Sequence, residues 1–196
     1  MSRRVWIGVA VVVVVLAVVR PWTVRPLHVD APPAFDPATY AGSLWPRVLD
    51  DANARAVDVT ATVAPASGSG AKARFMKGSG VVTAIDRTSR VGLLRVRLPG
   101  ASGPTIVIQI GPVLRGTTLR DAVSFIQFSD FTNQFDYAAA ANALNDHVLR
   151  AVIEPAGVDG LQGRTIRFVG ATSNAVAPDA PIEIVPVMIA VAEAGR

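Results

Sequence analysis

The spacing of apolar residues predicts strands in the middle and at the end of this chain. Three β-rich runs are separated by short turns, which is typical of an antiparallel meander, and they cover residues 80–86, 91–98 and 105–110. Residues 163–170 and 182–191 predict two further strands. Pro186 in the last run indicates an edge strand or a bulge, because proline donates no hydrogen bond to a ladder. We therefore expect about five strands.

Helical periodicity occurs before and between these strands. From Asp36 onward, apolar residues recur every three or four positions, with Asp36 suited to the N-cap and Pro37 to the first turn. Residues 133–154 predict a long amphipathic helix. Pro155 and Gly157 are the residues expected to terminate it.

A short helix and an aromatic run should connect the third strand to the long helix. After a tight turn at Gly111-Pro112, Thr118 and Asp121 have the spacing of a capping box, which predicts a helix over residues 119–123. Three phenylalanines then recur every three residues, and their large apolar area predicts that they belong to the core: Phe125, Phe128 and Phe131.

Three strands, a helix and two more strands are the element order of a small barrel of the oligonucleotide/oligosaccharide-binding (OB) kind. An open sheet with the long helix across one face has the same order and remains the alternative. We therefore expect an α+β fold. It would be a small antiparallel sheet or OB-like barrel with one long helix between strands three and four, preceded by an N-terminal helix and a single transmembrane anchor.

An uncharged apolar segment near the start of the sequence predicts the anchor. It runs from Val5 to Val19, follows Arg3 and Arg4, and is shorter than the roughly 20 residues of a typical spanning helix. A cleaved signal peptide is therefore an alternative, although no small-x-small cleavage site follows, and the arginine pair also resembles a twin-arginine export signal. We expect a single-pass protein of the bacterial inner membrane with an anchor, a proline-rich stalk and a periplasmic domain at residues 1–24, 25–35 and 36–196.

Charge and cysteine content narrow the classes of function. The 196 residues include 19 basic and 15 acidic ones, but four arginines flank the apolar segment, so the rest of the chain is neutral. The basic excess therefore belongs to the anchor, and we expect no nucleic-acid partner. The sequence contains no cysteine, which excludes disulfides, thiol nucleophiles, thiolate zinc sites and a lipid attached through cysteine.

The usual catalytic and metal-binding patterns do not occur. There is no G-x-S-x-G elbow, complete phosphate loop or His-x-x-x-His pair. His28 lies in the predicted stalk and His147 on the long helix, so their separation gives no metal-ligand spacing. We expect no enzymatic activity, no cofactor and no metal ion. A hydrolase that uses Asp121 or Asp130 is the remaining enzymatic alternative.

Polar residues gather between the third strand and the long helix. Polar side chains among apolar ones are either paired in the interior or exposed in a site. One interpretation is a structural network in which Arg115 and Arg120 pair with Asp121 and Asp130, pinning the loop to the helix. The other is a groove for a sugar or an anion. Its candidate binding residues are Arg115, Arg120, Asp121, Asp130, Asn133, Gln134, Tyr137 and Asn142.

The same stretch carries a family resemblance. Residues 109–138 contain the series IGPV, RGT, LRDA, FI, F, DF, NQ and YA, with KGSG at 77–80 and FDPATYAGSLWPRVL at 35–49 upstream. Together they resemble a bacterial family of predicted periplasmic lipoproteins, a domain of unknown function, over residues 35–191. The resemblance implies a periplasmic accessory role beside sugar-uptake ABC transporters. This sequence departs from the family in having no cysteine after the apolar segment, so a transmembrane helix is expected to anchor it.

Two hypotheses of function follow. The first is a non-enzymatic accessory or binding protein held at the inner membrane by the segment from Val5 to Val19. Residues 111–145 would contact ABC transporter components, a carbohydrate or an anionic small molecule. The second is a structural envelope protein that holds membrane partners together without a small-molecule ligand.

Overall fold

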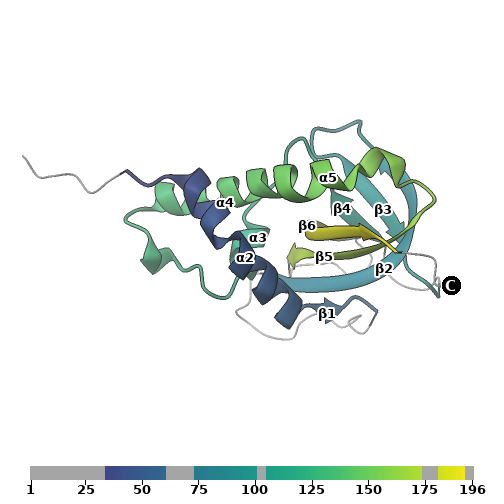
Figure 1. Ribbon diagram of the computed structural model, residues 1–196, viewed down its shortest axis with the longest axis horizontal. Coiled ribbons are helices and arrows are strands. Elements are labelled where there is room, and N and C mark those ends of the chain that lie inside the picture. The colour runs from purple at the N-terminus through teal and green to yellow at the C-terminus, as the bar shows by residue number, and fades with distance from the viewer. Residues whose placement is uncertain (1–33, 61–72, 101–104, 174–180, 193–196) are drawn as a thin grey trace, which may run out of the picture. The chain divides into compact units, whose positions relative to one another are not determined.

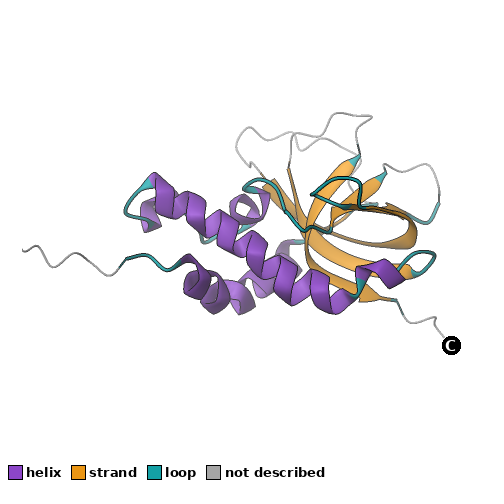
Figure 2. Ribbon diagram, turned by 90° about the horizontal axis from the view of Figure 1, so that it is seen from above, coloured by secondary structure: helices purple, strands orange, loops and turns teal. Residues whose placement is uncertain are grey.

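Five strands close into a barrel, and helices cover one side of it (Figures 1 and 2). The computed structural model describes residues 34–60, 73–100, 105–173 and 181–192. The strands are β1 (Val57–Asp58), β2 (Ala73–Asp86), β3 (Leu93–Arg97), β4 (Ile106–Gln109), β5 (Thr165–Ser173) and β6 (Ile182–Val191). The main helices are α2 (Pro37–Arg55), α3 (Thr118–Ala122) and α4 (Gln134–Val148), and the shorter ones are η1 (Phe128–Asp130), η2 (Leu149–Ile153), α5 (Glu154–Ala156) and η3 (Val158–Gly160).

The sheet closes on itself through β2. Its strand order is β1-β2-β3-β4-β6-β5, and β2 also pairs with β5. β2 is 14 residues long, so its first part lies antiparallel to β5 and its last part antiparallel to β3, with a register shift between Val82 and Ala84. The β4–β6 pair is parallel, and the short β1 runs parallel to β2 at the barrel's side. The predicted OB-like barrel is confirmed, and the alternative of an open sheet is wrong.

The first barrel strand begins earlier than predicted. We expected it at Gly80, but β2 starts at Ala73 and contains both Gly78 and Gly80. These glycines mark close approaches rather than a turn. A Cβ built on Gly78 would lie 2.8 Å from the Phe168 ring, and one on Gly80 would lie 2.4 Å from the carbonyl oxygen of Arg97. The missing side chains let neighbouring strands approach inside a strand that the sequence pattern treats as a loop.

Pro186 lies at a bulge and not on an edge strand. β6 pairs with β4 only as far as Ile184, and it continues along β5, where Pro186 lies opposite Gly170 beside a register shift. The proline therefore falls beyond the last β4 partner and beside the register shift with β5, which is a position where sheets tolerate proline. The sequence left both options open, and the bulge is the one that occurs.

Two side-chain caps fix the starts of the main helices. Asp36 accepts hydrogen bonds from the backbone N–H groups of Ala38 and Thr39 at 3.1 and 3.3 Å, as predicted for α2. Asn133 does the same for α4, accepting from Phe135 and Asp136 at 2.8 and 2.9 Å. At α3 the N-cap is Thr117 rather than the predicted Thr118, and no side chain caps the backbone there.

The long helix is not α-helical to its end, which corrects the prediction for residues 133–154. α4 ends at Val148 and continues as the π-helix η2, whose last turn is closed by the Glu154 N–H donating to the carbonyl of Leu149. Pro155 follows at once, and a proline ring clashes with the carbonyl four residues before it in an α-helix. A wider turn relieves that clash. Gly157, with φ of +54°, ends the helical segment as predicted.

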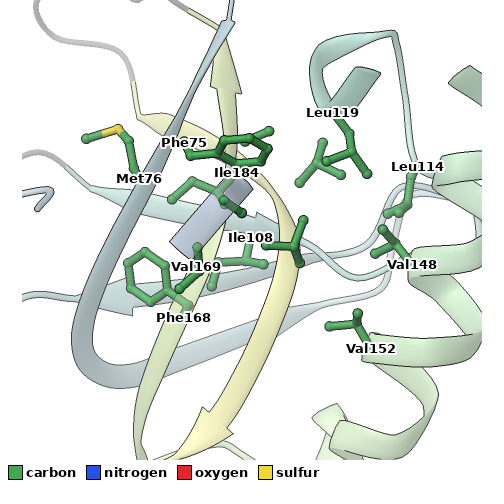
Figure 3. Packing of buried hydrophobic residues seen from close by; sticks show 14 of the residues in the cluster. Phe75, Met76, Ile108, Leu114, Leu119, Val148, Val152, Phe168, Val169 and Ile184 are labelled. Atoms are coloured by element: carbon green, nitrogen blue, oxygen red, sulfur yellow. The ribbon is translucent and has the colours of Figure 1, made fainter. Parts of the chain in front are cut away.

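One apolar core joins the barrel to the helices. Val148 and Val152 point from the end of α4 and from η2 toward Leu114 and the barrel strands, as Figure 3 shows. On the other side, Asp51 of α2 accepts hydrogen bonds from the backbone and hydroxyl of Ser124 at 3.0 and 2.8 Å. The loop between α3 and α4 is therefore attached to both α2 and the barrel.

The predicted anchor, including the segment from Val5 to Val19, lies outside the described residues, as does nearly all of the predicted stalk. Within the part of the chain that is described, no helix has the length and apolar character needed to cross a membrane.

Candidate functional site

Arg120 is the centre of the polar cluster that the sequence predicted. It belongs to α3, and its side chain is only 8% exposed. Nε and Nη2 donate to Asp121 Oδ1 at 3.0 and 2.7 Å, and Nη1 donates to the carbonyl oxygen of Tyr137 at 3.0 Å. The guanidinium also lies over the Tyr137 ring, 3.6 Å from its centroid. Arg120 therefore ties α3 to α4 through its planar face and Nη1, while Nε and Nη2 bind its neighbour Asp121 within α3.

Other polar groups hold the loop that precedes α3. The Thr117 hydroxyl donates to Asp121 Oδ2 at 2.7 Å, so both carboxylate oxygens are engaged. Asn145, buried in α4, donates to the carbonyl oxygen of Gly116 at 3.0 Å. Gln109 at the end of β4 accepts from the backbone N–H of Arg115 at 2.9 Å. These contacts form a structural network in which the predicted pair of Arg120 and Asp121 is confirmed, whereas the other partners were not identified from the sequence.

The remaining predicted residues do not join this network. Arg115 does not pair with either aspartate, which corrects the four-residue pairing, and its side chain is exposed. Asp130 accepts from the backbone N–H of Gln127 at 2.9 Å, and Asn133 caps α4. Gln134 and Asn142 are exposed on α4. The eight candidates thus divide between a buried network and a separate surface, and ligand binding by any of them stays a prediction.

An aromatic cluster occupies the end of the domain where α2 and α4 begin, away from the barrel (Figure 1). Phe35 and Tyr40 of the α2 region pack edge-on against Phe131, with centroids 5.5 Å away. Tyr137 lies 5.3 Å from Phe131 and 5.4 Å from Phe128. Phe135 lies two residues before Tyr137 on α4. We call this set of six residues the aromatic end: Phe35, Tyr40, Phe128, Phe131, Phe135 and Tyr137.

Two phenylalanines of the aromatic end face solvent. Phe128 is 55% exposed and Phe135 is 76% exposed. The prediction that Phe125, Phe128 and Phe131 are core residues is therefore wrong for Phe128, whereas Phe125 and Phe131 pack against the core. The reason is that the run is not one continuous helix: η1 is a single 3-10 turn between the extended residues Gln127 and Phe131, so a three-residue spacing does not keep all three rings on one face.

The aromatic end carries negative charge. Asp36, Asp130 and Asp136 belong to the segments that form it, and residues 34–46 and 124–146 contain no lysine or arginine. Burial is the main cause that raises the pKa of Tyr40, and the negative charge of Asp130 raises it further. This surface combines exposed apolar rings with the carboxylates of three aspartates, and the Arg120 guanidinium beneath the Tyr137 ring is already paired with Asp121.

A pocket of about 460 Å³ lies at the opposite end of α4. Its apolar lining comes from Ile110, Pro112, Leu149, Ile153 and Val158, and its polar groups from Arg87, Glu154 and Asp159. The local sequence pattern does not reveal this site. Pro112 and Gly157 were interpreted only as turn and helix-end signals, and no local pattern shows that the β2–β3 turn meets the segment after α4.

Histidine and carboxylate geometry gives no metal centre among the described residues, because no three such side chains lie close enough to share an ion. His147 instead packs its ring against Trp45, 4.6 Å between centroids. Burial lowers the pKa of His147, and the charge of Arg150 lowers it further.

Comparisons with known proteins agree with the fold and the family. The chain is similar to a crystal structure of an OB-fold protein from Thermotoga maritima, with 22% identity, a TM-score of 0.60 and coverage of 81% of this chain and 99% of that one. A weaker likeness, with a TM-score of 0.37 and 14% identity over 72% of this chain and 93% of that one, is to an OBody bound to hen egg-white lysozyme. No curated protein matches the sequence. The model of the family described as "Predicted periplasmic lipoprotein (DUF2291)" matches residues 9–190, and the chain therefore belongs to this family of unknown function.

Proposed function

We propose that this chain is a non-enzymatic accessory protein that binds another protein through its aromatic end. The observation that carries the proposal is the exposure of Phe128, which packs on the Tyr137 ring, and of Phe135 on α4. Exposed apolar surface next to an ordered aromatic cluster is typical of protein contacts. Because the rings beneath are already packed, little ordering would be needed when a partner binds.

The charge of the aromatic end supports a particular kind of partner. Asp130 and Asp136 flank the exposed rings, and residues 34–46 and 124–146 contain no lysine or arginine. A surface that presents basic side chains around apolar ones would complement it, and such complementarity favours one partner over others. A sugar or anion groove at Arg120 has less support, since the guanidinium nitrogens already donate within the protein.

The family description supports a periplasmic, membrane-associated location. Two finer points belong to our proposal: the segment from Val5 to Val19 anchors the protein as a single transmembrane helix, and the partner is a component of a sugar ABC transporter. The scaffolding hypothesis uses the same contact surface. It differs in that the protein would hold membrane partners together without serving transport.

Site-specific crosslinking in cells tests the proposal. A photoreactive phenylalanine analogue would replace Phe128 or Phe135 in the full-length chain, and the same analogue at Gln162, exposed before β5, would be the control. We expect protein adducts from the first two positions and none from the third. Mass spectrometry of the adducts would then distinguish a transporter component from other envelope proteins.

A matched charge pair tests the role of the acidic surface. Gln134 is exposed beside Phe135 and has no role in the network. Gln134→Lys should lower the adduct yield about tenfold, the loss expected when one like charge meets a basic partner at close range, whereas Gln134→Glu should preserve it. Equal yields from all three analogue positions, or from both Gln134 variants, would refute the proposed contact.

A further inference from the structure

Apolar side chains form the floor of the pocket beyond the end of α4. Ile110 and Ile153 are buried in the core, while Leu149 lies against Gly111, where an added Cβ would come within 2.5 Å of the leucine. The Leu149 side chain of η2 therefore packs directly on the backbone that follows β4. Its volume of about 460 Å³ is in the range of small-molecule sites.

The π-helix shapes this pocket. Leu149 and Ile153 are the first and last residues of η2, and both line it. Single π-turns inside helices occur frequently at functional sites. Immediately after η2, Pro155 and the left-handed Gly157 turn the chain back along the pocket's rim. The apolar floor is thus shaped by backbone features, whereas the polar lining residues Arg87, Glu154 and Asp159 are exposed side chains.

The polar groups of the pocket leave one negative charge unbalanced. Arg87 Nε and Nη2 both donate to Asp159 Oδ1 at 2.8 Å, so these two residues compensate each other. Glu154 also lines the pocket, and among the described residues its carboxylate has no hydrogen-bond or ion-pair partner. A cation that entered the pocket would find a free carboxylate above an apolar floor.

We propose that this pocket binds a small amphipathic amine, with its apolar body on Ile110 and Ile153 and its ammonium group on Glu154. An anion would meet the net negative charge of the lining, since the only arginine is already paired with Asp159. A sugar would find no aromatic ring among the lining residues to stack on. The site lies at the other end of the 15-residue α4 from the aromatic end, about 22 Å away at 1.5 Å per residue, so it does not depend on the proposed protein contact.

Methyl NMR of the full-length chain in phosphatidylcholine nanodiscs tests the proposal. The isoleucine δ1-methyl groups would be labelled and titrated with cyclohexylammonium, cyclohexanol and cyclohexanecarboxylate. We expect saturable shifts of Ile110 and Ile153 but not of Ile166, which is buried in the barrel. Cyclohexylammonium should bind about tenfold more tightly than either analogue, the equivalent of one charge-assisted hydrogen bond.

Three variants separate the pocket from general charge effects. Glu154→Gln should weaken cyclohexylammonium binding about tenfold, and Asp146→Asn, which removes a carboxylate exposed on α4, should leave it unchanged. Arg87→Gln should strengthen binding, because it leaves the Asp159 carboxylate without its cation. A variant that had merely unfolded would bind more weakly, so a gain in affinity distinguishes the two effects. Equal affinity for the three probes, equal effects of Glu154→Gln and Asp146→Asn, or shifts confined to other isoleucines would overturn the proposal.

Discussion

Arg115 and Arg120 lie five residues apart but have opposite environments. Arg120 is almost completely buried, and it stacks on Tyr137 while donating to Asp121 and the Tyr137 carbonyl. The Arg115 side chain is exposed, and only its backbone N–H is held, by Gln109. The two arginines therefore have different roles: Arg120 in α3 stabilises the fold, and Arg115 in the preceding loop belongs to the surface.

Replacing each arginine with alanine tests this division. Arg120→Ala should lower the free energy of unfolding by about 3 kcal/mol, because it leaves the partly buried Asp121 carboxylate without its cation. Arg115→Ala should change it by less than about 0.5 kcal/mol, as usual for an exposed position. Chemical denaturation of the two variants measures both values. Similar losses from both substitutions would contradict the network described here.

His147 predicts a pH dependence of stability near neutrality. Burial lowers its pKa from the ordinary value of 6.5 in the folded protein, so the unfolded chain binds the proton more readily. Stability should therefore be complete above about pH 7 and decline as the pH falls through 6.5 toward the folded-state pKa. The melting temperature of the wild type and of His147→Gln should be compared between pH 5 and 8. A wild-type slope that persists in the variant would assign the effect to other groups.

In the barrel, the local sequence pattern predicts where strands and helices lie, but it does not predict which strands pair. Alternation and turns predicted five strands, and Asp36 and Gly157 marked a helix start and a helix end. The β2–β5 closure and the parallel β4–β6 pair were not predictable individually, because they join residues far apart in the chain. Gly78 and Gly80 resemble a turn for the same reason: the Phe168 ring and the Arg97 carbonyl that exclude their side chains come from other strands.

Closure of the barrel is expected to require glycine at position 170. It lies in β5 opposite Pro186, and an added Cβ would come within 2.4 Å of Ile184 and 2.5 Å of the Val185 carbonyl oxygen. Gly170→Ala should therefore destabilise the protein by about 1–3 kcal/mol through overpacking. Gly160→Ala is the control, since no atom lies within 4 Å of its added Cβ. The melting temperatures should fall clearly for the first variant and little for the second; the reverse order would contradict the close packing at the bulge.

At the scale of the whole domain, the two candidate surfaces differ in how visible they are in the sequence. The aromatic end was partly predictable, since Phe128, Phe131 and Tyr137 belong to one continuous stretch of unusual residues. Their exposure was not, because it depends on where η1 turns the chain. The pocket could not be predicted from the sequence, because Arg87, Ile110 and Glu154 come from three separate segments and meet only after the barrel has closed.

The shared core predicts that the barrel and the helices unfold together. Leu144 of α4 is fully buried in the same apolar cluster as Phe168 of β5 and Val48 of α2. Leu144→Ala should lower the free energy of unfolding by about 2–5 kcal/mol. If the domain is one cooperative unit, the opening free energies of the amides in α2 and in β5 should fall by the same amount. Hydrogen exchange measured by mass spectrometry reads both segments in one experiment. Faster exchange confined to α2 and α4 would show that the helices open separately from the barrel, and the aromatic end would then be a surface that the barrel does not hold in place.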